Sequence, residues 1–189
     1  MRPTVRRSSP ALPCISTARE RRGRGARWGT STVSRHGAER VYSGLRLAVR
    51  AVIVEAGRLL LVNAYPGAQS DLWCAPGGGV EPHASLPENL AREVYEETGL
   101  AVRIGAPLAV SEFHDPGRDF HQVELFFAAR ITEGAPSATW ADTEGVVNRF
   151  RWAAKADMAA LRFKPDILPE LAFGTPAHAL YDPLEPIVP

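Results

Sequence analysis

From residue 45 onward, apolar positions fall into short blocks that are separated by polar or glycine-rich turns. Residues 45–65 hold two apolar runs divided by Glu55-Ala56-Gly57-Arg58, which predicts a β-hairpin. Further strands are expected at 71–75, 101–115, 121–131 and 149–154, with helices at 86–98, 154–161 and 165–173. This order predicts a single mixed α/β domain with helices on both sides of a sheet.

The stretch 86–98 has the clearest helical pattern. Ser85 and Glu88 form an S-x-x-E capping box, and Gly99 is the residue type that most often ends a helix. An apolar flank is expected to pack on the sheet, and it consists of Leu90, Ala91, Val94 and Tyr95.

Three glutamates crowd another flank of this helix. Glu93, Glu96 and Glu97 stand at i, i+3 and i+4, so their side chains are neighbours. Two carboxylates about 4 Å apart repel by about 4 kcal/mol at an effective dielectric near 20. A solvated face with splayed side chains would relieve the repulsion, and so would a bound cation. Because all the ligands are oxygen atoms, such a cation would be Mg²⁺ or Mn²⁺.

Three glycines, Gly77-Gly78-Gly79, precede the helix and allow a phosphate or a metal to approach the backbone closely. The loop lacks the GK[ST] of a Walker loop, and no GxGxxG precedes the helix. No organic cofactor site is predicted.

Length and composition agree with a globular enzyme or binding domain. The 189 residues are 45% hydrophobic and 23% charged, and no apolar run approaches the roughly 18 to 20 residues of a membrane helix. No membrane partner is therefore expected. Two cysteines, Cys14 and Cys74, are too few for a disulfide framework, so a cytoplasmic location is predicted.

The charge is distributed unevenly. Residues 1–40 hold ten arginines and two glutamates, whereas the remaining residues hold 12 basic and 19 acidic side chains. We expect 1–40 to be a disordered basic extension, which is incidental, a targeting signal or an RNA-contacting arm. The acidic body disfavours nucleic acid as a partner.

The string REVYEETGL at 92–100, preceded by PGGGVEP, resembles the signature of the Nudix hydrolases (MutT-like), and the similarity covers about 45–173. The resemblance implies an α/β/α sandwich around a mixed β-sheet. The domain is placed at 41–175, with a C-terminal tail at 176–189. The resemblance also implies metal-activated attack of water on the pyrophosphate bond of a nucleoside diphosphate that is linked to another moiety.

By position in the signature, Glu93, Glu96 and Glu97 match the metal-binding glutamates of the family. The carbonyl of Gly78 is a further candidate ligand of Mg²⁺ or Mn²⁺.

Arg92 matches the arginine of the signature, which orients glutamates by ion pairing. The resemblance gives the proton-accepting role to Glu93 or to a loop glutamate, for which Glu144 is the candidate. An exposed loop acid without such a role is the alternative for Glu144.

The sequence departs from the signature at His83 and Ala84, where glycine and glutamate are expected. The cluster thus keeps three of its four acids. Two alternatives follow: a hydrolase with weakened or rearranged catalysis, or a Nudix-fold nucleotide-binding sensor or regulator without turnover. An RNA-processing hydrolase is a third, disfavoured by the acidic body. His83 is either a metal ligand or a surface residue.

A nucleotide-type substrate with a base would need a flat aromatic wall. Phe113, Phe120 and Trp140 lie in or beside predicted loops and are the candidates.

Two charged residues lie in otherwise apolar strands. Arg50 must find either a phosphate or an acidic partner. Glu124 shares one face of its strand with Gln122 and faces either the substrate cleft or solvent. Arg50, Phe113 and Glu124 are therefore the predicted substrate-binding residues. Whether the chain forms a homodimer is left open.

Overall fold

The protein is represented by a computed structural model that describes residues 44–137, 140, 142 and 145–188. The strands are β1 Arg46–Glu55, β2 Arg58–Asn63, β3 Trp73–Cys74, β4 Ala101–Asp115, β5 Phe120–Glu133, β6 Phe150–Ala154 and β7 Leu180–Pro186. The α-helices are α1 Leu86–Thr98 and α2 Leu168–Phe173, and the 3-10 helices are η1 Pro116–Arg118 and η2 Lys155–Ala160. None of the helices in these residues is long and apolar enough to cross a membrane.

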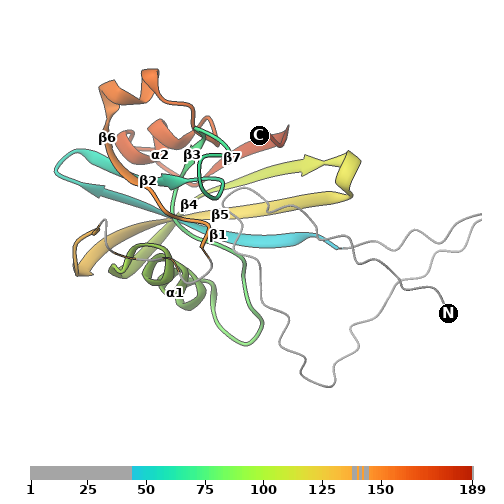
Figure 1. The fold of residues 1–189 in the computed structure, drawn as a ribbon. Helices are drawn as coiled ribbons and strands as arrows, with labels where there is room; N and C mark the ends of the chain where they lie inside the picture. Colours follow the sequence, from blue (N-terminus) through green and yellow to red (C-terminus); the bar gives the residue numbers. More distant parts are fainter. Residues whose placement is uncertain (1–43, 138–139, 141, 143–144, 189) are drawn as a thin grey trace, which may run out of the picture.

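The seven strands of the described residues belong to one mixed sheet, with the order β3-β2-β1-β5-β4-β7 and β6 paired with β2. β1 and β5 are parallel, as are β4 and β7, whereas the β1–β2 and β4–β5 pairs are antiparallel. Helix α1 covers one face of the sheet, and α2 with η2 covers the other (Figure 1). The predicted α/β sandwich around a mixed sheet is confirmed.

Strand β1 is buried on both faces, and its side chains alternate between two cores. Val49, Ala51 and Ile53 pack in a cluster that contains Leu90 and Val94 of α1. Val52 instead packs in a cluster with Leu168 and Leu171 of α2. Arg50 shares the register of Val52, so it points to the face that α2 covers.

The hairpin and the main helix form where the sequence predicts them. Val54 pairs with Leu59 across the first turn. Helix α1 begins after a complete capping box, in which the Ser85 N–H donates to Glu88 Oε2 at 2.8 Å. It ends at Gly99, whose φ of 73° lies in the left-handed region.

The predicted apolar flank of α1 is wrong at one end. Tyr95 is 52% exposed, and its ring meets that of Trp140 edge to face at a centroid distance of 5.3 Å. The buried residues of the helix instead include two of the glutamates, and they are Asn89, Leu90, Glu93, Val94, Glu97 and Thr98. A hydrophobic pattern does not predict this arc, because Glu93 is buried against Arg92 and Glu97 against the Gly77 N–H.

Part of the segment expected to be a C-terminal tail lies in the sheet. β7 runs parallel to β4, from the pair Ala109–Leu180 to the pair His114–Pro186. The proline-rich sequence of β7 does not indicate a strand, but an edge strand tolerates proline because one side of its backbone needs no partner. The predicted extension 1–40 lies outside the described residues.

Candidate active site

The three glutamates of the signature lie on α1 as their spacing predicts. Glu93 is 2% exposed and Glu97 is 8% exposed, whereas Glu96 is only half-buried. A helix that turns two carboxylates toward the interior needs specific partners for them, because burying an unpaired charge is costly.

Arg92 supplies one of these partners. Its Nη2 lies 2.8 Å from Glu93 Oε1, and its Nη1 lies 2.9 Å from Glu96 Oε2. The same Nη2 donates to Asn89 Oδ1 at 3.3 Å. One guanidinium therefore links two of the three glutamates, an arrangement of the kind that the signature implies for this arginine.

Glu97 has a different partner, the glycine loop. Its Oε2 accepts a hydrogen bond of 2.8 Å from the Gly77 N–H. Burial raises the pKa of Glu97 well above its ordinary value, and the charge of Arg50 and the Gly77 N–H offset only part of that rise. Glu97 is thus a buried carboxylate that would be stabilised by additional positive charge.

The glycine loop is fixed against the edge of β1. Val49 N donates to Gly78 O at 2.9 Å, and Val80 N donates to Leu47 O at 3.0 Å. Gly77 has a φ of 137°, and a Cβ on it would lie 2.1 Å from Val49 O. Only glycine fits this position. The Gly78 carbonyl, a predicted metal ligand, already accepts one hydrogen bond.

Arg50 connects this loop to the other face of the sheet. Its Nε donates to Glu124 Oε1 at 2.7 Å, and its Nη1 donates to the Gly77 carbonyl at 2.5 Å. Glu124 Oε1 also accepts from Gln122 Nε2 at 2.7 Å, and Gln122 accepts in turn from Arg46. Of the two partners that the sequence left open for Arg50, the structure shows the acidic one.

Asn89 is a site residue that sequence reasoning missed. It is 1% exposed, donates to the carbonyls of Glu81 and Ala84 at 3.2 Å each, and accepts from the Glu81 N–H at 2.9 Å. The available signal was an asparagine inside a helix, where it is disfavoured unless its amide bonds nearby backbone. It holds the loop that carries His83 and Ala84.

Both residues that depart from the signature are exposed. His83 has a φ of 74°, a left-handed conformation that suits the glycine expected there. Ala84 lies directly before the N-cap of α1, so a longer acidic side chain would enter solvent beside the start of the helix.

A divalent metal fits this site by chemistry and charge. Two of the three carboxylates of α1 pair with one guanidinium of their own helix, the third binds a backbone N–H, and every potential ligand atom is oxygen. In the described part of the chain, however, no three His, Cys, Asp or Glu side chains converge as ligands of one ion. Because they do not converge, binding of one ion by all three glutamates would require a change in their side-chain conformations.

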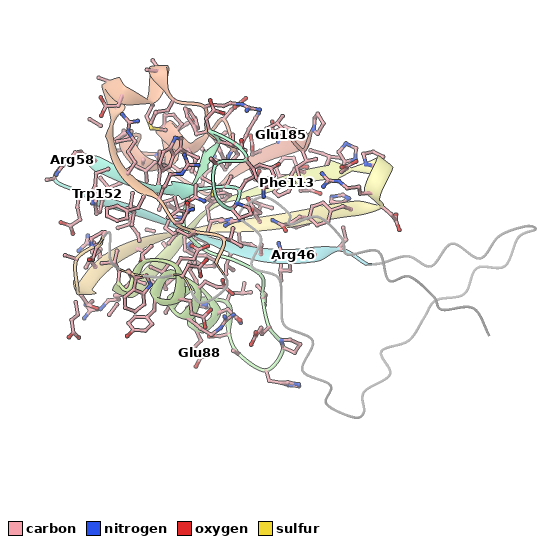
Figure 2. All side chains as sticks on the ribbon, viewed as in Figure 1. Arg46, Arg58, Glu88, Phe113, Trp152 and Glu185 are labelled. Carbon is pink, nitrogen blue, oxygen red and sulfur yellow. The ribbon has the colours of Figure 1, made fainter. Side chains whose placement is uncertain are left out.

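A pocket with about 460 Å³ of empty space, part of it open solvent, lies on the face of Arg50. Arg50, Phe113 and Glu124, the three predicted substrate-binding residues, all line it. Figure 2 shows Phe113 on the side of the sheet away from Glu88 and α1.

The other candidates from the sequence lie elsewhere. Trp140 packs at the end of α1, where its Nε1 donates to the Glu96 carbonyl at 3.0 Å. Phe120 does not line the pocket but packs against Phe113, with ring centroids 6.0 Å apart. Glu144 lies outside the described residues.

Comparison with known proteins gives consistent results. The rat diphosphoinositol polyphosphate phosphohydrolase 2 is 31% identical over 126 residues, which cover 65% of this chain and 59% of the rat protein. The solution structure of the E. coli ORF135 protein superposes with a TM-score of 0.50 at 27% identity, covering 68% of this chain and 88% of that one. A NUDIX hydrolase from Nitrosomonas europaea gives a TM-score of 0.58 at 21% identity, covering 68% and 86%.

The rat relative is thus matched over less than two thirds of its length. The sequence model of the NUDIX domain matches residues 44–171, more than half of the chain. This match includes the glycine loop, α1 with its glutamates, and both strands that carry the buried ion pair. The chain belongs to the NUDIX domain family.

Proposed function

We propose that this protein is a metal-dependent hydrolase that cleaves the pyrophosphate bond of a nucleoside diphosphate linked to another moiety. The observation that carries the proposal is the pair of buried carboxylates on α1, namely Glu93, which pairs with Arg92, and Glu97, which binds the glycine loop. A merely structural helix face has no need of two buried acids that repel each other.

Glu93, Glu96 and Glu97 are the residues that would hold the cation, Mg²⁺ or Mn²⁺. When bound, such an ion neutralises pyrophosphate charge and lowers the pKa of a bound water. Arg92 holds two of these carboxylates on one side of the helix, and the Gly77 N–H holds the third. Glu93 is our assignment for the group that accepts the proton of the attacking water, with Glu144 as the alternative.

Hydrolysis as the reaction class has support from a relative. The rat protein is named a phosphohydrolase of diphosphoinositol polyphosphates. Its substrate is not transferred to this chain, because the two proteins share 31% identity over part of their lengths.

A second function, a nucleotide-binding sensor without turnover, is favoured by one observation. Ala84 supplies no carboxylate where the signature has one, and the neighbouring Asn89 orders the loop through an uncharged amide. A chain that retains the fold and pocket but lacks one acid of the cluster would bind its ligand and release it unchanged.

The test is release of phosphate or mononucleotide from a panel of nucleoside diphosphate derivatives, with Mg²⁺, with Mn²⁺ and with EDTA. We expect metal-dependent turnover that falls at least 100-fold in Glu97→Gln. Glu88→Gln is the matched control, because it alters an exposed glutamate of the same helix and glutamine can replace it in the capping box.

The two functions differ in the turnover that they predict for the wild type and for Ala84→Glu. A hydrolase turns over substrate before and after this substitution. A wild-type protein without turnover that gains it in Ala84→Glu would instead be the binder, and the hydrolase proposal would be withdrawn.

A further inference from the structure

The pocket beside Arg50 is closed by a part of the chain that lies outside the family match. The match ends at residue 171, whereas Glu185, Pro186, Ile187 and Val188 all line the pocket. We call residues 180–188 the C-terminal strap. Figure 2 shows Glu185 near Phe113, with which it pairs across β7 and β4.

Contacts along its whole length hold the strap in place. Asp182 Oδ2 accepts a buried hydrogen bond of 2.9 Å from Ser111 Oγ on β4. Farther along, the Ile187 N–H donates to the His114 carbonyl at 2.9 Å. The Tyr65 hydroxyl donates to the Val188 carbonyl at 2.7 Å. The strap therefore spans from the edge of the sheet to the loop between β2 and β3.

The strap also supplies half of an ion pair at the pocket. Lys164 Nζ lies 2.5 Å from Glu185 Oε2, and it lies 3.1 Å from Asp166 Oδ1. Arg50 and Glu124 form the other pair, at 2.7 Å. Among the described residues, the charged side chains that line the pocket are thus two cations and two anions, each cation bound to one of these anions.

The pairing of these charges indicates which chemical class of ligand the pocket binds. Recognition of several phosphate groups needs cations whose donors are available for them. Both of these cations pair with carboxylates, and the remaining lining residues in the part of the chain that the structure describes are apolar, including Leu72, Phe113 and Ile187. An uncharged ring fits such a pocket, whereas a polyphosphorylated ring would meet two carboxylates and two cations that already bind them.

We propose that the C-terminal strap is a specificity-determining wall of the substrate site, which rests on the function proposed above. The strap admits an uncharged ring-bearing group of the substrate, such as a nucleoside, and excludes a polyphosphorylated one. Arg50 joins this subsite to the phosphate-cleaving site, because it lines the pocket and also binds the Gly77 carbonyl beside Glu97.

The experiment is calorimetric titration of the full chain with AMP, GMP, CMP, UMP and myo-inositol hexakisphosphate, in Mg²⁺ and physiological salt. We expect at least one nucleoside monophosphate to bind and the inositol phosphate to bind at least tenfold more weakly. Ile187→Trp, which fills the pocket from the strap, should weaken nucleotide binding at least tenfold.

Leu184→Trp is the matched control, because Leu184 lies on the same strap, is 43% exposed and does not line the pocket. Its affinity should stay within twofold of wild type. If Ile187→Trp unfolds, as a thermal scan would show, Ile187→Ala replaces it, with an expected weakening of at least threefold.

Three results would overturn the proposal: unchanged nucleotide affinity in the folded Ile187 variant, no nucleotide binding by wild type, or preference for the inositol phosphate. Because calorimetry requires no turnover, these results are separate from failure of the hydrolase proposal. A protein that binds nucleotides through the strap but cleaves nothing rejects hydrolysis alone. One that cleaves its substrate with a KM unaffected by Ile187→Trp rejects the strap alone.

Discussion

The two faces of the sheet carry two parts of the site that are built in different ways. On the face of α1, the charged groups come from a few consecutive residues of one helix, 92 to 97. On the other face, the pocket is lined by residues that range from Arg50 to Val188. The helix alone brings Arg92, Glu93 and Glu96 together, and only Glu97 needs the glycine loop, whereas the second part exists only once the strands and the strap have assembled.

The two arginines of the site show the energetic side of this difference. Arg92 is 32% exposed and pairs with glutamates one and four residues away. Arg50 is 2% exposed and pairs with Glu124, 74 residues away. Removing one member of a fully buried pair leaves a charge without compensation, whereas a pair with one partly solvated member should lose less stability on truncation.

The largest effect should therefore come from Arg50→Met. It leaves Glu124 buried without its cation and removes a donor from the Gly77 carbonyl. We expect the free energy of unfolding to fall by about 3 to 5 kcal/mol, measured by urea denaturation. Arg92→Met, the comparison on the other face, also leaves the buried Glu93 without its cation, but Arg92 itself is 32% exposed, so we expect a smaller loss of about 1 to 2 kcal/mol.

A double variant sharpens this comparison. Arg50→Met with Glu124→Leu removes both charges of the pair and should recover part of the lost stability, because Glu124 is no longer buried without its cation, although Glu97 still loses the nearby charge of Arg50. A loss in Arg50→Met as small as that in Arg92→Met would contradict the distinction between the two faces.

The next effect concerns Gly77, whose peptide groups contact both parts of the site. In Gly77→Ala the added Cβ would lie 2.1 Å from Val49 O, and φ is 137°, so the loop must move. We expect a loss of about 2 to 4 kcal/mol in unfolding free energy from overpacking and backbone strain, with loss of turnover. Gly67→Ala, at a φ of 61° in open space, isolates the strain and should cost about 1 kcal/mol.

The sequence predicts the structure of the α1 face better than that of the pocket face, because local signals form the one and long-range contacts form the other. The bounds of α1 are predicted to the residue, because the capping box and Gly99 are local signals. The mixed sheet is predicted from strand patterns and from the resemblance to the family. The position of the strap is not predicted, because a proline-rich segment shows no strand pattern. Its pairing with β4 also depends on contacts with residues about 70 positions away.

The residues of the candidate site also differ in how well the sequence predicts their positions. Spacing on a helix places Glu93, Glu96 and Glu97 together without any knowledge of the fold. By contrast, the sequence leaves the partner of Arg50 open, since strand order decides that Glu124 lies beside it. Lys164 and Glu185 carry no signal at all, because their meeting depends on where the strap runs.

A smaller effect tests the local signal that starts α1. Ser85→Ala removes the N-cap and should lower the free energy of unfolding by about 1 kcal/mol near neutral pH. Hydrogen bonds from the Ser85 hydroxyl and N–H hold the pKa of Glu88 below its ordinary value of 4.5. A depressed pKa adds stability above the unfolded-state pKa, and that stability is lost as the pH falls through the folded-state value.

The difference in stability between wild type and Ser85→Ala should therefore be widest at neutral pH and narrow below about pH 4.5, the ordinary pKa of Glu88. Denaturation at a series of pH values measures it. A difference that instead grew toward acid would show that Ser85 does not stabilise the ionised form of Glu88.

The smallest effect on stability is expected for a substitution of Trp140. The useful comparison there is of substrate binding, measured as KM, between the two faces of the sheet. Trp140→Phe loses the hydrogen bond from Nε1 to the Glu96 carbonyl but keeps an aromatic ring beside Tyr95. Because Trp140 is 38% exposed, we expect a loss of only about 0.5 kcal/mol. The KM should stay within twofold of wild type, whereas Phe113→Ala, on the pocket face, should raise it about tenfold. A tenfold rise in KM for Trp140→Phe alone would instead place the ring of the substrate at the end of α1 and remove it from the pocket under the strap.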